Sequence, residues 1–233
     1  MDIHITHLLV QEPIQVNKFN ILYIKKIYMN KKIKDQTDLS YSTNTLWPFE
    51  IDKCHGWAYS NNVFSKEECE KIIKIGENKN LKTALVGDGK EEKKIRTSKI
   101  NWLYPNQETD WIYRRLTDAV TFLNKEYFGF KLFGFTEGLQ FTKYEAPSGH
   151  YAKHIDKMFG RTIRKLSITV QLSDPNDYEG GELELVFGQK PDIMDKEQGK
   201  LIAFPSYALH EVKAVTKGKR YSLVAWITGD AFL

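Results

Sequence analysis

The sequence predicts an α+β protein that is mainly β, a jelly-roll barrel braced on its outer face by N-terminal helices. From Leu132 onward the chain breaks into short segments in which apolar and polar residues alternate, with turn-forming residues between them. About eight such segments are typical of a jelly roll, whose mouth can hold a small ligand. Two segments upstream instead repeat apolar residues at helical spacing.

The chain has 233 residues and 41% hydrophobic content, enough for one domain with a substantial buried core. Residues 1–45 show no clear periodicity and end in the polar run DQTDLSYSTNT. We therefore expect them to form an N-terminal extension that is poorly ordered or peripheral. Residues 46–233 form the predicted domain.

Two helices are predicted before the β-rich part. The first runs from Ser65 to about Asn78, because Ser65 and Glu68 have the spacing of a capping box. The second runs from Glu108 to Tyr127. Each has an apolar face that should pack on the core. These faces consist of Cys69, Ile72, Ile73 and Gly76 in the first helix, and of Ile112, Leu116, Val120, Leu123 and Tyr127 in the second.

The predicted strands each have one polar face, since side chains two residues apart project to the same side. In 138–144 the face opposite Leu139 and Phe141 carries Gln140, Thr142 and Tyr144. In 166–172 four aliphatic residues alternate with Ser167, Thr169 and Gln171. Further strands are expected at 182–187, 201–204 and 220–227, the last of them after a turn at Gly218.

His154, Asp156 and His210 form the candidate metal site. Two imidazoles and one carboxylate can occupy one face of an iron(II) ion and leave other positions open. On a strand, His154 and Asp156 would share a face while Ile155 turns back to the core. A lone His-x-Asp triplet usually means a surface hydrogen bond, but His210 follows near the end of a later strand. His150 is a competing ligand, which we place in a loop, in a supporting or surface role.

Arg220 follows His210 by ten residues and should project into the barrel with Ser222 and Trp226. A buried arginine needs an anionic partner, because an unpaired buried charge is costly. One partner is an internal carboxylate, Glu182 or Glu184. The other is a bound dicarboxylic acid held in a two-pronged hydrogen bond.

The composition of the chain indicates the cellular compartment and limits the classes of binding partner. The net charge of +4 arises from 34 basic and 30 acidic side chains, which does not require nucleic acid. Cys54 and Cys69 are too few for a disulfide framework, and we expect reduced thiols in a cytoplasmic chain. The N-terminus does not look like a secretion signal, and no apolar run is long enough to span a bilayer, so no membrane partner is expected.

Residues 136–228 resemble the 2-oxoglutarate- and iron(II)-dependent oxygenases, in the branch of prolyl 4-hydroxylases and PKHD-type hydroxylases. The resemblance rests on Tyr144, His154-Ile-Asp156, LSITVQLSDPNDYEGGELEL and LIAFPSYALHEVKAVTKGKRYSLVAW. A weaker match is Ile95–Ser98 with Asn101–Leu103, which is similar to a mobile segment that covers the substrate. Collagen-type prolyl hydroxylases usually carry lysine at the position of Arg220, which favours the PKHD-like branch.

The resemblance implies a double-stranded β-helix, the cupin-like form of the jelly roll, and an enzyme that hydroxylates an unactivated C–H bond. Its cofactors would be Fe(II), 2-oxoglutarate as cosubstrate and O2, with stimulation by ascorbate and with succinate and CO2 as coproducts. His154, Asp156 and His210 would be the catalytic iron ligands. Residues that would bind the cosubstrate are Arg220, Tyr144, Ser222 and Thr169.

The substrate is expected to be a peptide or protein, most simply at a peptidyl proline, approached along Arg96, Tyr151 and Trp226. A free amino acid, another protein side chain and a small metabolite remain alternatives. A related nucleic-acid demethylase would carry a second arginine where this chain has Trp226. A jelly-roll module that binds peptide or sugar without catalysis explains the strands, but not the four polar residues together. The sequence does not indicate the oligomeric state.

Overall fold

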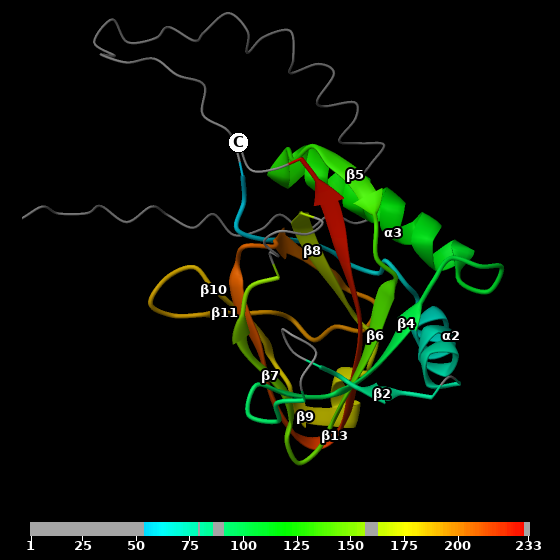
Figure 1. Cartoon of the computed structure of the whole chain (residues 1–233), viewed down its shortest axis with the longest axis vertical. Coiled ribbons are helices and arrows are strands. Elements are labelled where there is room, and N and C mark those ends of the chain that lie inside the picture. The colour runs from blue at the N-terminus through cyan, green and yellow to red at the C-terminus, as the bar shows by residue number, and fades with distance from the viewer. Residues whose placement is uncertain (1–53, 79, 86–90, 157–162, 231–233) are drawn as a thin grey trace, which may run out of the picture.

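Two β-sheets joined by one long strand form the molecule, as seen in the computed structural model, which describes residues 54–78, 80–85, 91–156 and 163–230 (Figure 1). The fold is mainly β and is a jelly roll, as predicted. The joining strand is β13 (Leu209–Gly229), whose two halves belong to different sheets. The predicted extension at residues 1–45 lies outside the described residues.

The larger sheet pairs with the C-terminal half of β13. Within the described residues its hydrogen-bonded ladder ends at β1 and β2, so it does not close into a ring. Its strands in spatial order are β1 (Ala58–Ser60), β12 (Leu201–Pro205), β8 (Arg164–Gln171), β13, β6 (Leu139–Glu145), β4 (Lys99–Leu103) and β2 (Lys82–Thr83), with β5 (Leu132–Phe135) pairing the end of β13.

The smaller sheet pairs with the N-terminal half of β13. Its strands are β3 (Arg96–Thr97), β7 (Gly149–His154), β9 (Tyr178–Gly180), β10 (Leu183–Val186) and β11 (Asp192–Ile193). The 3-10 turn Pro175–Asp177 leads into β9. In Figure 1 this sheet lies on the side of the molecule away from the helices.

Gly218 marks the bend at which β13 passes from the smaller to the larger sheet. The prediction of a turn at this position was wrong, because the strand continues through it. Gly218 has a φ of 71°, and a Cβ there would lie 2.1 Å from the carbonyl oxygen of Asp177. Glycine therefore permits both the conformation and the close approach to β9. One bent strand consequently carries residues of both sheets to the same interior.

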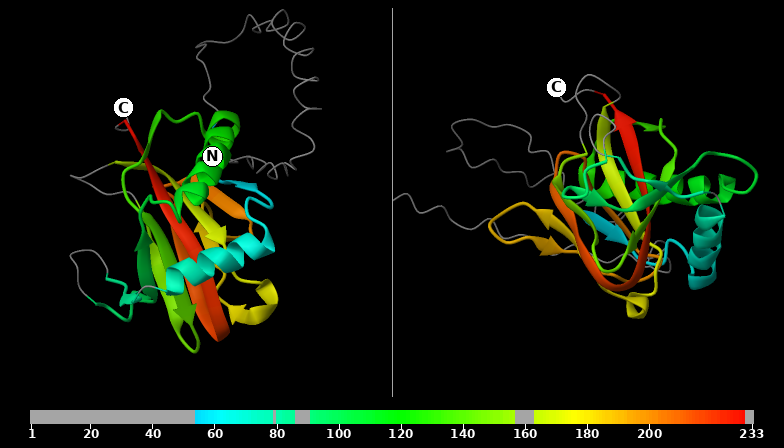
Figure 2. Two further views of the ribbon diagram at one scale, coloured as in Figure 1. Left: turned by 90° about the vertical axis from the view of Figure 1, so that its right-hand side faces the viewer. Right: turned by 60° about the horizontal axis from the view of Figure 1, so that its bottom comes forward.

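Two helices cover the outer face of the larger sheet, as Figures 1 and 2 show. Helix α2 (Lys66–Glu77) begins at Ser65 with the predicted capping box to Glu68. Its buried face includes Ile75, whereas Ile73 is only half-buried, so that part of the predicted face was wrong.

Helix α3 (Asp110–Leu123) begins two residues later than predicted and continues as a π-helical turn, Asn124–Phe128. The whole predicted apolar stripe of this second helix is buried.

Strand β8 separates the helix-facing core from the interior. Its aliphatic residues Leu166, Ile168 and Val170 are completely buried in the main apolar cluster with both helices, as their alternation predicted. The intervening polar residues point the other way, between the sheets. A second apolar cluster there includes Tyr144, Leu183, Phe204 and Val212. The interior therefore has a polar surface on one side and apolar packing around it.

Of the helices that the structure describes, none is long and apolar enough to cross a membrane. Cys54 is an exposed thiol and Cys69 a buried one.

Candidate metal centre and adjoining cleft

His154, Asp156 and His210 meet between the two sheets, with their possible ligand atoms all within 4.8 Å of one another. His154 Nε2 lies 3.7 Å from Asp156 Oδ1, and His210 Nε2 lies 3.5 Å from Asp156 Oδ2. The histidines are register partners on β7 and β13. These are the three residues that the sequence analysis proposed as ligands, brought together from positions far apart in the chain.

Hydrogen bonds determine the tautomer of each histidine. The Nδ1–H of His154 donates to the carbonyl oxygen of Ala152 (2.8 Å), and that of His210 donates to Ala208 (2.9 Å). A carbonyl oxygen only accepts, so Nδ1 carries a proton in both residues, and Nε2 is the ring nitrogen that can coordinate a metal when the imidazole is neutral. Burial, with the charge of neighbouring His210 if protonated, lowers the pKa of His154 to about 4. The His154 imidazole is therefore neutral at physiological pH, the form that metal coordination needs.

Asp156 is fixed by two serines. Ser167 donates its hydroxyl to Asp156 Oδ2 (2.8 Å), and the backbone N–H of Asp156 donates to the carbonyl oxygen of Ser206 (2.9 Å). The hydroxyls of Ser167 and Ser206 are 2.9 Å apart. Burial alone would raise the pKa of Asp156, but the two histidines and the hydrogen bond from Ser167 hold it below its ordinary value. An ionised carboxylate beside the Nε2 atoms of two imidazoles is a donor set that fits a divalent iron ion.

The expectation that Ile155 turns back to the core was wrong. Its side chain is 43% exposed and lines the cleft beside the triad. Strand β7 ends at His154, so the alternation of side chains does not extend to Asp156. The carboxylate reaches the site because of the Ser206 and Ser167 contacts rather than strand geometry.

Arg220 is 1% exposed and points into the same interior. Its Nη2 donates to Gln171 Oε1 (2.9 Å), whereas Nε and Nη1 have no hydrogen-bond partner within the described part of the chain. Glu182 instead pairs with Lys196 at 2.7 Å. No carboxylate of the described residues forms an ion pair with Arg220, which favours the second of the two partners considered, a bound dicarboxylate.

Tyr144, Thr169 and Ser222 surround Arg220 in a small inner cavity that the metal cluster also lines. The guanidinium carbon of Arg220 lies 5.3 Å from the centre of the Tyr144 ring, its register partner on β6. Gly181, with a φ of 66°, permits this arrangement, because a Cβ there would lie 3.0 Å from Arg220 Cδ. The structure thus brings all four predicted cosubstrate residues together.

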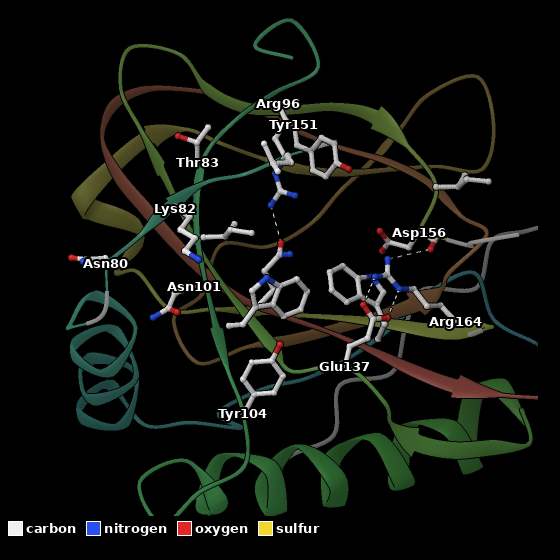
Figure 3. Close-up of a pocket in the computed structure, with 16 residues that line it drawn as sticks. Asn80, Lys82, Thr83, Arg96, Asn101, Tyr104, Glu137, Tyr151, Asp156 and Arg164 are labelled. Atoms are coloured by element: carbon white, nitrogen blue, oxygen red, sulfur yellow. Dashed lines mark hydrogen bonds and ion pairs between the residues drawn. The ribbon is translucent and has the colours of Figure 1, made fainter. Parts of the chain in front are cut away.

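An outer cleft of about 960 Å³ adjoins the inner cavity, and Arg96, Tyr151 and Trp226 line both (Figure 3). Arg96 and Tyr151 are side by side, with the guanidinium carbon 4.5 Å from the ring centre. The guanidinium of Arg164 stacks on Trp226 at 3.8 Å. The segment that the resemblance identified as covering the substrate forms strands β3 and β4, which are paired to β7 and β6 and form a wall of the cleft.

His150 is not part of the metal cluster. It lies in β7 rather than in the expected loop, and its ring nitrogens contact the carbonyl oxygens of Ser148 and Lys94. Sequence reasoning missed Ser167, Gln171 and Ser206. Ser167 and Gln171 share the polar face of β8 with Thr169, so strand parity could have identified them. Ser206 gave no such signal, since it follows Pro205 at the end of β12.

Comparison with known sequences gives two consistent results. Residues 139–228 match the model of the 2OG-Fe(II) oxygenase superfamily. A PKHD-type hydroxylase of Prochlorococcus marinus strain MIT 9515 is 33% identical over 161 residues, which cover 67% of this chain and 72% of the relative. Another from strain MIT 9312 is 32% identical over 173 residues, covering 72% and 76%.

Solved structures with the same fold include prolyl hydroxylases. A Pseudomonas putida prolyl-4-hydroxylase superposes with a TM-score of 0.60 at 21% identity, covering 76% of this chain and 94% of that one. A prolyl hydroxylase from Trichoplax adhaerens, in complex with a hypoxia inducible factor peptide fragment, gives 0.64 at 18% identity, covering 75% and 84%. At these identities the likeness establishes the fold alone.

Proposed function

Because this chain belongs to the PKHD-type hydroxylases of the 2OG-Fe(II) oxygenase superfamily, we propose that it hydroxylates a peptidyl proline. Fe(II), 2-oxoglutarate and O2 are the cofactors of this superfamily. The observation that supports the proposal best is the single inner cavity that His154, Asp156, His210 and the unpaired Arg220 line together. A jelly-roll module without catalysis would have no use for this combination.

We assign iron binding to His154 Nε2, His210 Nε2 and the Asp156 carboxylate. When bound, iron and 2-oxoglutarate supply the oxygen-activating chemistry, with succinate and CO2 as coproducts. The protein fixes the ligands through the Nδ1 hydrogen bonds of the histidines and the Ser167 hydroxyl on Asp156. Such contacts hold the ligands in position before the metal arrives.

Arg220 is proposed to hold the far carboxylate of 2-oxoglutarate. Its Nε and Nη1 have no hydrogen-bond partner among the described residues, so their N–H groups are available to carboxylate oxygens. The Tyr144 and Ser222 hydroxyls, with the weaker candidate Thr169, can donate to the same group, since all three line the cavity. Burial of these donors excludes water and strengthens their hydrogen bonds.

The size and rim of the outer cleft favour a peptide. At about 960 Å³ it lies at the upper end of small-molecule pockets. Three exposed side chains at its edge, Leu85, Tyr104 and Ile155, offer apolar surface beyond the metal cluster. Trp226 and Tyr151 would flank the target ring.

The exposed and buried thiols, Cys54 and Cys69, support a reducing compartment such as the cytoplasm.

The test is succinate formation from 2-oxoglutarate with Fe(II) and ascorbate, with and without a proline-rich peptide, followed by mass analysis of the peptide. We expect the peptide to stimulate succinate release and to gain one oxygen. Slow release that no peptide changes would exclude the peptidyl substrate and favour a free amino acid, another side chain or a small metabolite. The Asp156→Ala variant is the control for succinate formed without the site.

A further inference from the structure

Arg96 lies where the outer cleft meets the inner cavity, and it lines both. Its side chain is almost fully buried, at 7% exposure. Nε donates to Ser98 Oγ and Nη2 to Gln140 Oε1, both at 2.8 Å, and the guanidinium stacks on Tyr151. These partners hold the group in one orientation but carry no negative charge.

Among the described residues that line the cleft, no free carboxylate is available to balance the charge of Arg96. Of the described residues that line the cleft, only Glu137 and Asp156 carry carboxylates. Glu137 accepts two hydrogen bonds from Arg164, at 2.7 and 2.5 Å, and is thereby neutralised (Figure 3). Asp156 belongs to the metal cluster. No carboxylate of the described residues is within ion-pair distance of Arg96, and its Nη1 has no hydrogen-bond partner among them.

The net charge of the site, Arg96 included, stays positive once the cofactors are bound. Iron(II) and Arg220 bring three positive charges, and the Asp156 carboxylate with the two carboxylates of 2-oxoglutarate brings three negative ones. Arg96, which lines both the outer cleft and the inner cavity, then keeps a positive charge that no carboxylate of the described lining residues balances. The remaining Nη1 of this desolvated guanidinium gains most from a carboxylate acceptor, because a charge-assisted hydrogen bond is stronger than a neutral one.

We propose that Arg96 binds a carboxylate of the substrate, so that the preferred substrate is acidic beside the hydroxylated residue. This inference rests on the proposed hydroxylase function and specifies its substrate class. Two sources share the chemistry: an Asp or Glu side chain flanking a proline within a peptide, and the main-chain carboxylate of a C-terminal or free proline. The apolar rim of Leu85, Tyr104 and Ile155 favours the flanking side chain, because this rim offers a surface on which a peptide extending beyond the proline can lie.

The experiment measures binding to protein loaded with Mn(II) and 2-oxoglutarate, by fluorescence polarisation. The probes are a labelled peptide with glutamates flanking proline, the same peptide with glutamines, and a short peptide ending in proline as the acid or as the amide. We expect an acid to bind at least about tenfold tighter than its neutral counterpart. Arg96→Gln should reduce that ratio to within about twofold, and Arg96→Lys should give an intermediate ratio. Arg114→Gln, which removes the same charge from an exposed position on α3, should leave it unchanged.

Each possible result of this experiment either supports or overturns the role of Arg96. A preference for the glutamate peptide identifies the flanking side chain, and a preference for the free acid terminus identifies the main-chain carboxylate. Equal binding of acidic and neutral probes by the wild type overturns the inference but leaves peptidyl hydroxylation standing, and this comparison needs no variant to fold. If no peptide binds, the peptidyl substrate is excluded. The role of Arg96 is then tested by comparing the succinate release that L-proline stimulates with the release that L-prolinamide, which lacks the carboxylate, stimulates. Equal effects of these two compounds would overturn the inference as well.

Discussion

His154 and His210 face each other as register partners of β7 and β13, with ring centres 4.1 Å apart. Each donates Nδ1–H to the carbonyl oxygen two residues before it, in Ala152 and in Ala208. The same local geometry thus recurs on two antiparallel strands and directs both Nε2 atoms to Asp156. The metal site is therefore preorganised by backbone pairing rather than by the ion alone.

Replacing His154 or Asp156 by alanine should abolish metal binding and turnover while leaving the fold intact, since the strands are held by backbone pairing. Metal content after dialysis, circular dichroism and succinate release measure the three effects. His150→Ala is the matched control, because His150 lies in β7 outside the cluster. Wild-type metal content or activity in either ligand variant would refute the assignment.

Ser167→Ala should weaken metal binding by roughly tenfold or more, because Asp156 loses the hydroxyl that orients it. Competition for Co(II) against a chelator measures the affinity without turnover. Ser148→Ala, at an exposed position before β7, is the control. An affinity equal to that of the wild type would show that the Ser206 backbone contact suffices to position the carboxylate.

Arg220→Ala should raise the apparent KM for 2-oxoglutarate strongly, by about tenfold or more. The same variant should lose the increase in Tm that 2-oxoglutarate gives to Mn(II)-loaded wild type, since a ligand stabilises only the state that it binds. Arg114→Gln should keep both properties. An unchanged KM would return Arg220 to a purely structural role.

Gly76→Ala should destabilise the protein, although alanine usually stabilises a helix by about 1 kcal/mol relative to glycine. A Cβ at this position would lie 2.4 Å from the completely buried ring of Phe141, which cannot move away. We expect a loss of about 1–3 kcal/mol in the free energy of unfolding, measured with urea. Adding Phe141→Leu should recover part of the loss, and a stabilised Gly76→Ala variant would contradict the packing of α2 on β6.

Cys69 should resist alkylation in the native protein. Burial, followed by the nearby Glu68, raises the pKa of its thiol to about 12, and the thiolate is the reactive form. In mildly alkaline buffer, iodoacetamide should therefore modify the exposed Cys54 and spare Cys69 until denaturant is added. Peptide mapping by mass spectrometry checks this, and modification of both thiols at equal rates would contradict the burial of α2.

The sequence predicted those features that depend on local periodicity. The capping box at Ser65 and the alternation in β8 are both present, and the latter places Thr169 in the cavity. The sequence-based predictions failed where tertiary contacts override periodicity. Ile155 is exposed because β7 has ended before it. Gly218 bends one continuous strand, where the sequence pattern predicted a turn between two strands. The pairing of Arg164 with Glu137 joins segments far apart in the chain, and no spacing rule connects them.

The most direct test of the central claim, that one cavity holds both metal and 2-oxoglutarate, is calorimetric titration of 2-oxoglutarate into protein with and without Mn(II). The site predicts binding to the metal-loaded protein that becomes at least about tenfold weaker without metal, because 2-oxoglutarate then loses the metal and keeps only Arg220 as a charged anchor. Equal affinity with and without Mn(II), or binding that survives unchanged in Asp156→Ala, would contradict it.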